Sequence, residues 1–313
     1  MNTLSRREFL WTAATVPAAA AGLVGAFAAD APNPATPRKR VVVGAHPWVY
    51  AAQRPGFDII PILPSIFADM EYAGFDGIEL IQFVLRSTEV CEQVRQLSKK
   101  HHLQIIGCSF MGTTGTSFTG RMCDRAQHRG ILEEAELIVP RLAQLGGRTL
   151  GISVGAARQR KTEQQLDDQS DLLRQLIALC ARHRVVLNLH NHTYEVANNM
   201  HDLKGTLSRI PDVKLGPDLG WLARAGVDPV SFIRQYGKQI VFLHLRDQKD
   251  NRWSEAMGEG DMDYAAVGRA LHEVGFQGDA VVELAHEKDF QPTRPLRESL
   301  KRSRAVVKEK LGY

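Results

Sequence analysis

The sequence predicts an α/β fold, a single (β/α)8 TIM barrel, and three observations support this assignment. Short apolar segments rich in Val, Ile and Leu alternate with longer amphipathic segments eight times between residues 40 and 313. The apolar segments are nearly continuous, as expected for parallel strands that are buried on both faces. Eight such units in about 270 residues match this barrel better than an open sheet.

Each predicted strand is followed by a predicted helix. The strands are residues 40–45, 76–80, 103–109, 148–154, 185–189, 213–218, 239–245 and 279–284. The helices are residues 61–73, 88–101, 123–145, 161–183, 198–208, 229–236, 264–274 and 294–310. No Gly-x-Gly-x-x-Gly follows the first strand, which disfavours a dinucleotide-binding sheet. Residues 111–120, rich in Gly and Thr, are predicted to be a flexible loop.

Residues 1–28 are predicted to be an export signal. The segment Ser5-Arg6-Arg7-Glu8-Phe9-Leu10 precedes an apolar run, and Ala26-Phe27-Ala28 supplies a small-x-small cleavage pattern. This segment resembles a twin-arginine signal and predicts export to the periplasm, with no stable membrane insertion after cleavage. An uncleaved segment would act as a membrane anchor, although the run is short for a spanning helix. Residues 29–39, rich in Pro and Ala, are predicted to be a disordered linker.

Composition excludes several classes of protein. The 313 residues are 44% hydrophobic and 24% charged, which is ordinary for a soluble globular protein. The formal net charge is +4 and the charges are interspersed, so we expect no nucleic-acid partner. The four cysteines, Cys91, Cys108, Cys123 and Cys180, lack a Cys-x-x-Cys spacing and are predicted to be free thiols.

The segment Val185–Glu195 carries the first candidate site residues. It begins as an apolar strand and ends in His190-Asn191-His192. Residues two apart on a strand point to the same side, so His190 and His192 project together and can bind a metal. Two hydrogen-bonded histidines at a strand end explain the same pattern equally well.

Other strand ends carry acids, histidines and aromatic residues, and barrel enzymes place their active site at these ends. They are His46, Trp48, Glu79, Asp218, Trp221, His244, Arg246, Asp247, Glu283 and His286. Taken singly, each has a structural explanation, such as a turn residue or a helix cap. Together they indicate a site, because buried acids and histidines are costly unless they are paired or bind a metal.

The four strands from the fifth to the eighth supply His190, Asp218, His244 and Glu283 as predicted ligands of one divalent metal ion. Two nitrogens and two carboxylates suit Mn²⁺, Zn²⁺, Co²⁺ or Fe²⁺, with Mg²⁺ also allowed, better than Ca²⁺. Such a set leaves coordination positions open, which favours catalysis over a purely structural site.

The chain resembles the xylose isomerase-like TIM barrel superfamily, often labelled sugar phosphate isomerase/epimerase. The segments that carry this resemblance are Gly74–Glu79, His190–His192, Asp218–Trp221, His244–Asp247, Gly258–Gly260 and Val282–Glu283. The resemblance places Asp218, His244 and Glu283 on metal-ligand positions. Many members carry Glu-Asn-His where this chain has His190-Asn191-His192, so only Glu283 remains of the two glutamates that the family's epimerases use.

The resemblance implies a metal-dependent sugar isomerase or epimerase that acts through an enediolate, with Glu283 or His190 moving the proton. Because exported enzymes rarely meet phosphorylated metabolites, we expect an unphosphorylated sugar or keto-sugar. The predicted substrate-binding residues are His46, Trp48, Glu79, His192, Trp221 and Arg246. The single glutamate keeps a lyase, a dehydratase or a 3-keto-glycoside-cleaving enzyme as the alternative.

Two further classes are disfavoured. An abasic-site endonuclease with this barrel needs three zinc ions and a basic DNA-binding face, and the sequence shows neither. An exported sugar-binding protein without catalysis would bind sugar but no metal. A homo-oligomer is compatible with all of these features.

Overall fold

The computed structural model describes residues 40–112 and 121–313. The predicted export signal, the predicted linker and most of the predicted flexible loop lie outside these ranges. The described residues form one compact unit. No helix of the described ranges is long and apolar enough to cross a membrane.

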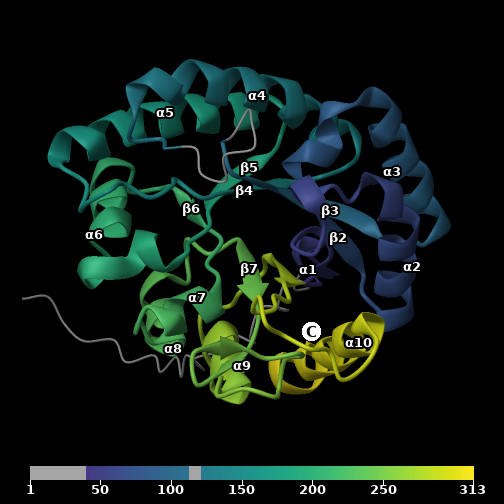
Figure 1. Ribbon diagram of the computed structural model, residues 1–313. Helices are drawn as coiled ribbons and strands as arrows, with labels where there is room; N and C mark the ends of the chain where they lie inside the picture. The colour runs from purple at the N-terminus through teal and green to yellow at the C-terminus, as the bar shows by residue number, and fades with distance from the viewer. Residues whose placement is uncertain (1–39, 113–120) are drawn as a thin grey trace, which may run out of the picture. The chain divides into compact units, whose positions relative to one another are not determined.

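Eight parallel strands form the barrel and confirm the predicted fold class (Figure 1). They are β1 (Val43–Ala45), β2 (Gly77–Ile81), β3 (Gln104–Phe110), β4 (Thr149–Ile152), β5 (Val186–Leu189), β6 (Lys214–Leu215), β7 (Phe242–Leu245) and β10 (Asp279–Val282). Hydrogen bonds connect them in the order β6-β5-β4-β3-β2-β1-β10-β7. Two parallel bridges, Leu215 with Ile240 and Asp218 with His244, join β6 to β7 and close the ring.

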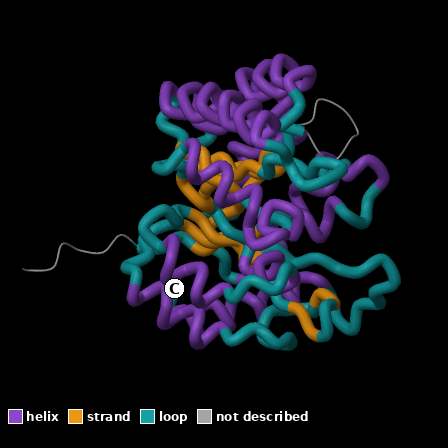
Figure 2. The backbone as a smooth tube through the Cα atoms, turned by 90° about the vertical axis from the view of Figure 1, so that its left-hand side faces the viewer, coloured by secondary structure: helices purple, strands orange, loops and turns teal. Residues whose placement is uncertain are grey.

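Eight longer helices surround the strands, as Figure 2 shows in purple. They are α2 (Leu63–Ala73), α3 (Thr88–Lys100), α4 (Arg125–Gln144), α5 (Glu163–Arg182), α6 (Thr193–Arg209), α8 (Pro229–Tyr236), α9 (Tyr264–Glu273) and α10 (Leu296–Val306). Each matches a predicted helix, and α10 continues into a π-helical turn, Val307–Leu311.

Short elements were not predicted, because they are too short to show a periodic pattern. They are α1 (Trp48–Ala51), α7 (Leu219–Arg224), the 3₁₀ turns Pro55–Phe57, Ile60–Ile62 and Gln82–Arg86, and the hairpin of β8 (Gln248–Lys249) and β9 (Arg252–Trp253).

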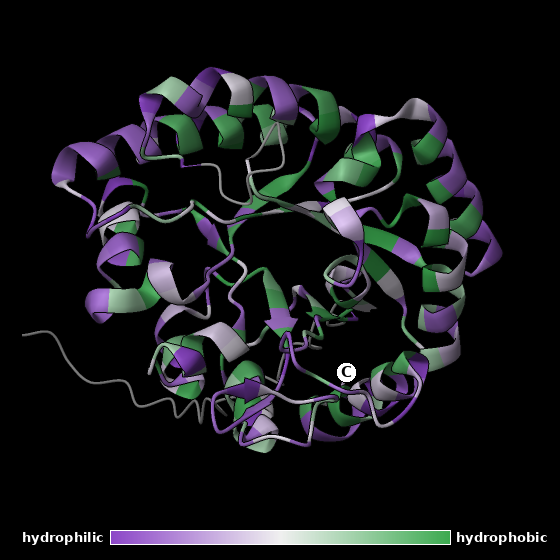
Figure 3. Cartoon of the chain, in the orientation of Figure 1, coloured by the Kyte–Doolittle hydropathy of each residue, from purple (hydrophilic) through white to green (hydrophobic). Residues whose placement is uncertain are grey.

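Local sequence signals set the helix ends. Ser87 caps α3 by accepting a hydrogen bond from the Val90 amide, and Thr162 forms a capping box with Gln165 at the start of α5. Gly74 ends α2 in the left-handed conformation that glycine adopts without strain. The helices turn their apolar faces inward and their polar faces outward (Figure 3).

The barrel strands alternate their side chains between the interior and the helix layer. On β7, Phe242 shares its face with His244, and on β10 Val281 shares its face with Glu283, two residues further on. Phe242 and Val281 belong to a small buried apolar cluster with Val42 and Ile106. Polar side chains at the carboxyl ends therefore stand above an apolar floor.

Gly216, directly after β6, permits the close approach of β6 to its neighbours. A Cβ atom there would lie 1.9 Å from Oδ1 of Asn188 and 3.3 Å from Cβ of Phe242. We expect Gly216→Ala to lower the free energy of unfolding by about 1–3 kcal/mol, because Asn188 and β6 must shift. Urea unfolding of the metal-free protein measures this change.

Gly151→Ala in β4 is the matched control, since a Cβ atom there meets its nearest neighbour, Oε1 of Glu79, at 3.4 Å. Little loss of stability is expected for this variant. Equal destabilisation by the two substitutions would contradict the close-approach explanation.

Candidate active site and metal centre

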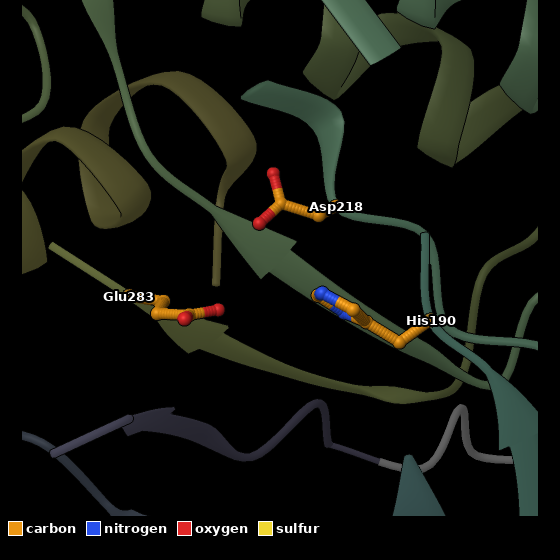
Figure 4. A group of neighbouring side chains, drawn as sticks. All are labelled: His190, Asp218 and Glu283. Atoms are coloured by element: carbon orange, nitrogen blue, oxygen red, sulfur yellow. The ribbon is translucent and has the colours of Figure 1, made fainter. Parts of the chain in front are cut away.

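The closure of the barrel brings acids and histidines together at one end. Asp218 is bridged to His244 on β7, and Glu283 follows β10, which pairs with β7. His190 follows β5, the neighbour of β6. As expected for the carboxyl ends of barrel strands, the side chains of His190, Asp218 and Glu283 point toward one another (Figure 4).

One potential ligand atom from each of His190, Asp218 and Glu283 lies within 4.8 Å of the other two. Asp218 is fully buried and Glu283 is 8% exposed. Two buried carboxylates this close repel each other, and both lose their hydration. The cluster is therefore built to hold a positive charge.

His244 lies beside this cluster and is oriented by Glu79. Its Nε2 lies 2.7 Å from Oε2 of Glu79, and its Nδ1 lies 3.1 Å from Nδ1 of His190. Metal-binding histidines usually donate their second ring N–H to a carboxylate, which fixes the tautomer and the ring orientation. With Nε2–H donated to Glu79, the Nδ1 lone pair of His244 faces the cluster.

Arg246 supplies a positive charge to the same carboxylates. Its Nη2 lies 2.7 Å from Oδ2 of Asp218 and 2.5 Å from Oε2 of Glu283. The guanidinium carbon also lies 5.6 Å and 5.0 Å from the ring centroids of Trp221 and Trp253. Arg246 is only 3% exposed, so this charge is held in a largely dry environment.

Burial and neighbouring charges separate the pKa values of the cluster. Burial would raise the pKa of Glu283, but Arg246, His46 and His244 outweigh it and hold the pKa at about 2. Burial raises the pKa of Asp218 above its usual value despite Arg246. Burial and the neighbouring histidines hold the pKa of His190 well below 6.5, so this imidazole is neutral, the form that binds metals.

The pKa of His244 moves in the opposite direction. Burial alone would lower it, but Glu79, Glu283 and Asp218 together raise it to about 9. Without a metal, His244 therefore carries a proton at neutral pH. The protonated ring is a second positive charge in the acidic cluster.

The residues present fit a divalent metal ion. In the described part of the chain, Oδ2 of Asp218 accepts no hydrogen bond of acceptable geometry, although the atom is fully buried. Three carboxyl groups lie here: Glu79 contacts His244, and Asp218 and Glu283 share the guanidinium of Arg246. If all three are ionised and the histidines are neutral, a divalent ion balances the remaining charge. His190, Asp218 and Glu283 would hold it, and His244, the fourth predicted ligand, lies beside them with its Nδ1 3.1 Å from Nδ1 of His190.

A cavity of about 250 Å³ opens above this cluster. Its wall is largely apolar and aromatic, with Trp48, Ile81, Phe110, Met111 and Trp221. Polar side chains reach it from several strand ends, namely His46, Ser109, Ser153, His190, His192, Tyr194, His244, Arg246 and Glu283. Apolar walls with a few converging polar groups are typical of a site for one small molecule.

His46 has a defined tautomer. Its Nδ1 accepts a hydrogen bond from the backbone N–H of Trp48, so Nε2 carries the proton and donates to Oγ of Ser109, 2.9 Å away. Burial lowers the pKa of His46, partly offset by Glu283 and Glu79. His46 therefore presents a neutral, fixed ring to the cavity.

A second polar group lines another part of the cavity. Oγ of Ser153 donates to Oε1 of Glu195 at 2.6 Å and lies 3.1 Å from the hydroxyl of Tyr194. That hydroxyl lies 3.0 Å from Nδ1 of His192. Glu195 also accepts a hydrogen bond from the His192 amide at 2.7 Å. The His192 ring is thereby positioned at the cavity edge.

Asp247 organises the loop that follows β7. Its carboxylate accepts hydrogen bonds from the amides of four residues, Gln248, Gly258, Gly260 and Met262, at 2.8–3.2 Å. This loop carries Trp253, which packs against Trp221 in an edge-to-face contact. Asp247 thus supports one wall of the site from outside the cavity.

The structure brings most of the predicted site residues together. His46, Trp48, His190, His192, Trp221, His244, Arg246 and Glu283 line the cavity, and Asp218 lies against Arg246. Glu79 is fully buried against His244 and does not line the cavity. We therefore assign it the role of orienting the His244 ring, not the predicted role of contacting substrate.

Sequence reasoning missed Ser109, Ser153, Tyr194 and Glu195. Ser109 and Ser153 stand at the ends of the third and fourth predicted strands. The strand-end rule would have identified both if it had been applied to these two strands. Tyr194 and Glu195 follow His192 directly, but their contacts depend on the start of α6.

Comparisons with known proteins agree with this architecture. The family described as "Xylose isomerase-like TIM barrel" matches residues 67–306. An inosose dehydratase of Clostridium tetani is 25% identical over 271 residues, covering 78% of this chain and 88% of that protein.

Two solved structures share the fold. The 3-keto-D-glucoside 4-epimerase YcjR of E. coli superposes with a TM-score of 0.67 at 18% identity, covering 85% of this chain and 100% of that one. The IolI protein with a bound zinc atom gives a TM-score of 0.67 at 15% identity, covering 87% and 98%.

We expect Glu79→Gln to lower the pKa of His244 from about 9 in the metal-free protein, because the substitution removes the negative charge that accepts a hydrogen bond from Nε2 of His244. A histidine with a raised pKa stabilises the fold below its unfolded pKa of about 6.5, and this contribution disappears as pH rises through about 9. A shift of this size corresponds to on the order of 3 kcal/mol. Between these pH values, the free energy of unfolding of Glu79→Gln should therefore fall less than that of the wild type.

Histidine NMR titration and urea unfolding at several pH values measure both effects. Glu255→Gln is the control, because it removes a carboxylate away from His244, whose contacts are with Thr293 and Arg294. A pKa of His244 that stays near 9 in Glu79→Gln would contradict the assignment of Glu79.

Proposed function

Because the chain belongs to the xylose isomerase-like TIM barrel family, we propose that it is a divalent-metal-dependent sugar isomerase or epimerase. Its substrate is an unphosphorylated sugar or keto-sugar, and the reaction passes through an enediolate. The observation that carries the proposal is the convergence of His190, Asp218 and Glu283 at the base of a cavity, at the carboxyl ends of three strands.

When bound, a divalent ion supplies Lewis-acid stabilisation of negative charge on a substrate oxygen. The zinc atom in the similar IolI protein supports a metal requirement. The chain's own residues supply the proton chemistry. Glu283 and the neutral ring of His190 both face the cavity and are the candidates for moving a proton at a carbon beside a carbonyl.

The remaining cavity residues suit a polyhydroxylated ligand. Trp48 and Trp221 offer flat apolar faces for the C–H side of a sugar ring. Nε1 of Trp221 is buried and has no hydrogen-bond partner in the described part of the chain. His192 and Tyr194 present further polar atoms at the edge, so hydroxyl groups of a sugar find donors and acceptors on two walls.

The distribution of charge supports an unphosphorylated substrate. Among the described residues that line the cavity, Arg246 is the only lysine or arginine, and its guanidinium is paired with Asp218 and Glu283. A phosphate group usually requires dedicated cationic or helix N-terminal partners. The predicted twin-arginine signal supports the same conclusion, and we propose that the enzyme acts in the periplasm.

A dehydratase is the second candidate. The similar inosose dehydratase of Clostridium tetani supports it, as does His190, which by the resemblance to the family stands in place of one of the two glutamates of its epimerases. On a bound keto-sugar, one of the two groups, a carboxylate or an imidazole, can abstract a proton from carbon. The other can protonate the leaving hydroxyl group, which departs as water.

Incubation of the metal-loaded protein with sugars, inososes and 3-keto-glycosides in D₂O, followed by NMR, tests the proposal. Deuterium at a carbon beside a carbonyl with an isomeric product is expected for the isomerase or epimerase. Unsaturated or cleaved products would select the dehydratase or lyase. No exchange and no turnover across the panel would overturn the enzyme assignment and favour a binding protein.

We expect Asp218→Asn to lower metal affinity by about tenfold or more while the fold is retained. Asp218 also caps α7 by accepting a hydrogen bond from the Trp221 amide, and asparagine caps helices equally well. His244→Ala should also reduce bound metal. Elemental analysis after dialysis and thermal melting measure metal content and fold.

Asp263→Asn is the matched control, because Asp263 is likewise the N-cap of a helix, α9, but is exposed and outside the cluster. Metal content should stay at the wild-type level there. Unchanged metal content in both Asp218→Asn and His244→Ala would contradict the ligand assignment.

A further inference from the structure

Arg246 forms ion pairs with two of the proposed metal ligands. Its Nη2 lies 2.7 Å from Asp218 and 2.5 Å from Glu283. Both carboxylates belong to the group of three whose ligand atoms converge. The guanidinium therefore performs part of the task of a cation in this cluster: it places one positive charge between two buried carboxylates that would otherwise repel each other.

From this geometry, and resting on the proposed function, we propose that Arg246 is a displaceable counter-ion of the metal site. In the metal-free protein it holds Asp218 and Glu283 together. When a divalent ion binds these carboxylates, the guanidinium leaves Glu283 and turns into the cavity, where its N–H groups face the substrate. Arg246 thereby competes with the metal and couples metal binding to the assembly of the substrate site.

The surroundings of Arg246 allow this movement. Its side chain already lines the cavity of about 250 Å³, and its Nε has no hydrogen-bond partner within the described ranges. The guanidinium lies near the faces of Trp221 and Trp253, contacts that impose no fixed hydrogen-bond direction. Few directional contacts other than the two carboxylates hold the head group in place.

The stem of Arg246, in contrast, is fixed. A Cβ atom at Gly220 would lie 2.5 Å from Cγ of Arg246, so the absence of a side chain at Gly220 leaves the passage for this stem. The hydroxyl of Tyr264 donates a hydrogen bond to the backbone carbonyl of Arg246 at 2.7 Å. The backbone and stem stay in place while the head group exchanges its partners.

This arrangement orders the binding steps. Before the metal binds, the N–H donors on Nη2 of Arg246 are directed at Asp218 and Glu283. A substrate that requires these donors then binds tightly only after the metal has taken over the carboxylates. The energetic consequence for the metal is a weaker affinity than the same ligands would have without the competing charge.

Metal titration of the apo-protein by isothermal calorimetry, with Zn²⁺ and Mn²⁺ in turn, tests the proposal. Arg246→Met removes the charge and keeps a long apolar side chain. We expect it to bind each ion about tenfold or more tightly than the wild type, because the permanent positive charge beside the ligands is gone. Arg246→Gln, a second neutral variant, should show the same direction and carries the test if Arg246→Met does not fold.

Arg224→Met is the control. Arg224 lies over Trp253 at 3.6 Å, but its polar partners are Gln248, the Asn251 carbonyl and Glu287, none of which is a predicted ligand. Its loss removes a neighbouring cation and should leave the metal dissociation constant within about twofold of wild type.

Tryptophan fluorescence during the Zn²⁺ titration gives an independent readout. The wild type should show a change that saturates with the calorimetric isotherm, because Arg246 alters its contacts with Trp221 and Trp253. In the Arg246 variants this change should be absent or much reduced.

The outcomes separate the two proposals. Wild-type metal binding with equal or weaker binding by both folded Arg246 variants overturns the counter-ion role and leaves the proposed function standing. Metal binding only by the Arg246 variants supports the counter-ion role but overturns metal dependence of the natural chain. No binding by any variant overturns both.

Discussion

The closure of the barrel between β6 and β7 is the constraint on which the site depends. β6 consists of only two residues, and its contact with β7 is reduced to two bridges, Leu215 with Ile240 and Asp218 with His244. Asp218 takes part in the second bridge and also begins α7 through its hydrogen bond to the Trp221 amide. One residue thus closes the ring, starts a helix and enters the carboxylate cluster.

The electrostatics of the cluster follow from contacts across the barrel interior. Glu79 on β2 orients His244 on β7, although these strands are not neighbours in the sheet. Buried side by side, Glu283 has a lowered pKa and Asp218 a raised one. The difference between these two pKa values comes from the neighbouring charges, because both groups are carboxyl groups with similar pKa values in water. Asp218 and Glu283 share the positive charge of Arg246, which lowers the cost of burying them.

Much of the fold and part of the site could be predicted from the sequence. Strands and long helices have local signatures, namely apolar runs, amphipathic periods and caps such as Thr162 and Gly74. The meeting of His190, Asp218, His244 and Glu283 at the ends of β5, β6, β7 and β10 followed from one topological rule, that parallel barrel strands present their carboxyl ends together. The rule depends only on the order of strands along the chain, which the sequence shows.

The contacts that define the chemistry had no such signature. The ion pairs of Arg246 and the hydrogen bond of Glu79 to His244 depend on spacing across the interior, where Glu79 and His244 meet although they are 165 positions apart in the sequence. The wall formed by Ser153, Tyr194 and Glu195 depends on how α6 starts after His192. Short elements such as α7 arise from a single cap and a bridge, not from a periodic pattern.

The hydrogen bonds of Asp247 make the base of the loop after β7 different from its tip. The carboxylate fixes the loop base through Gln248, Gly258, Gly260 and Met262, whereas the tip of the hairpin, Asp250 and Asn251, is exposed and has positive φ angles. The tip is therefore a natural attachment point: a label or an inserted peptide there extends into solvent while the base keeps Trp253 against Arg246. Loop length can vary at this position during evolution or engineering without reshaping the cavity.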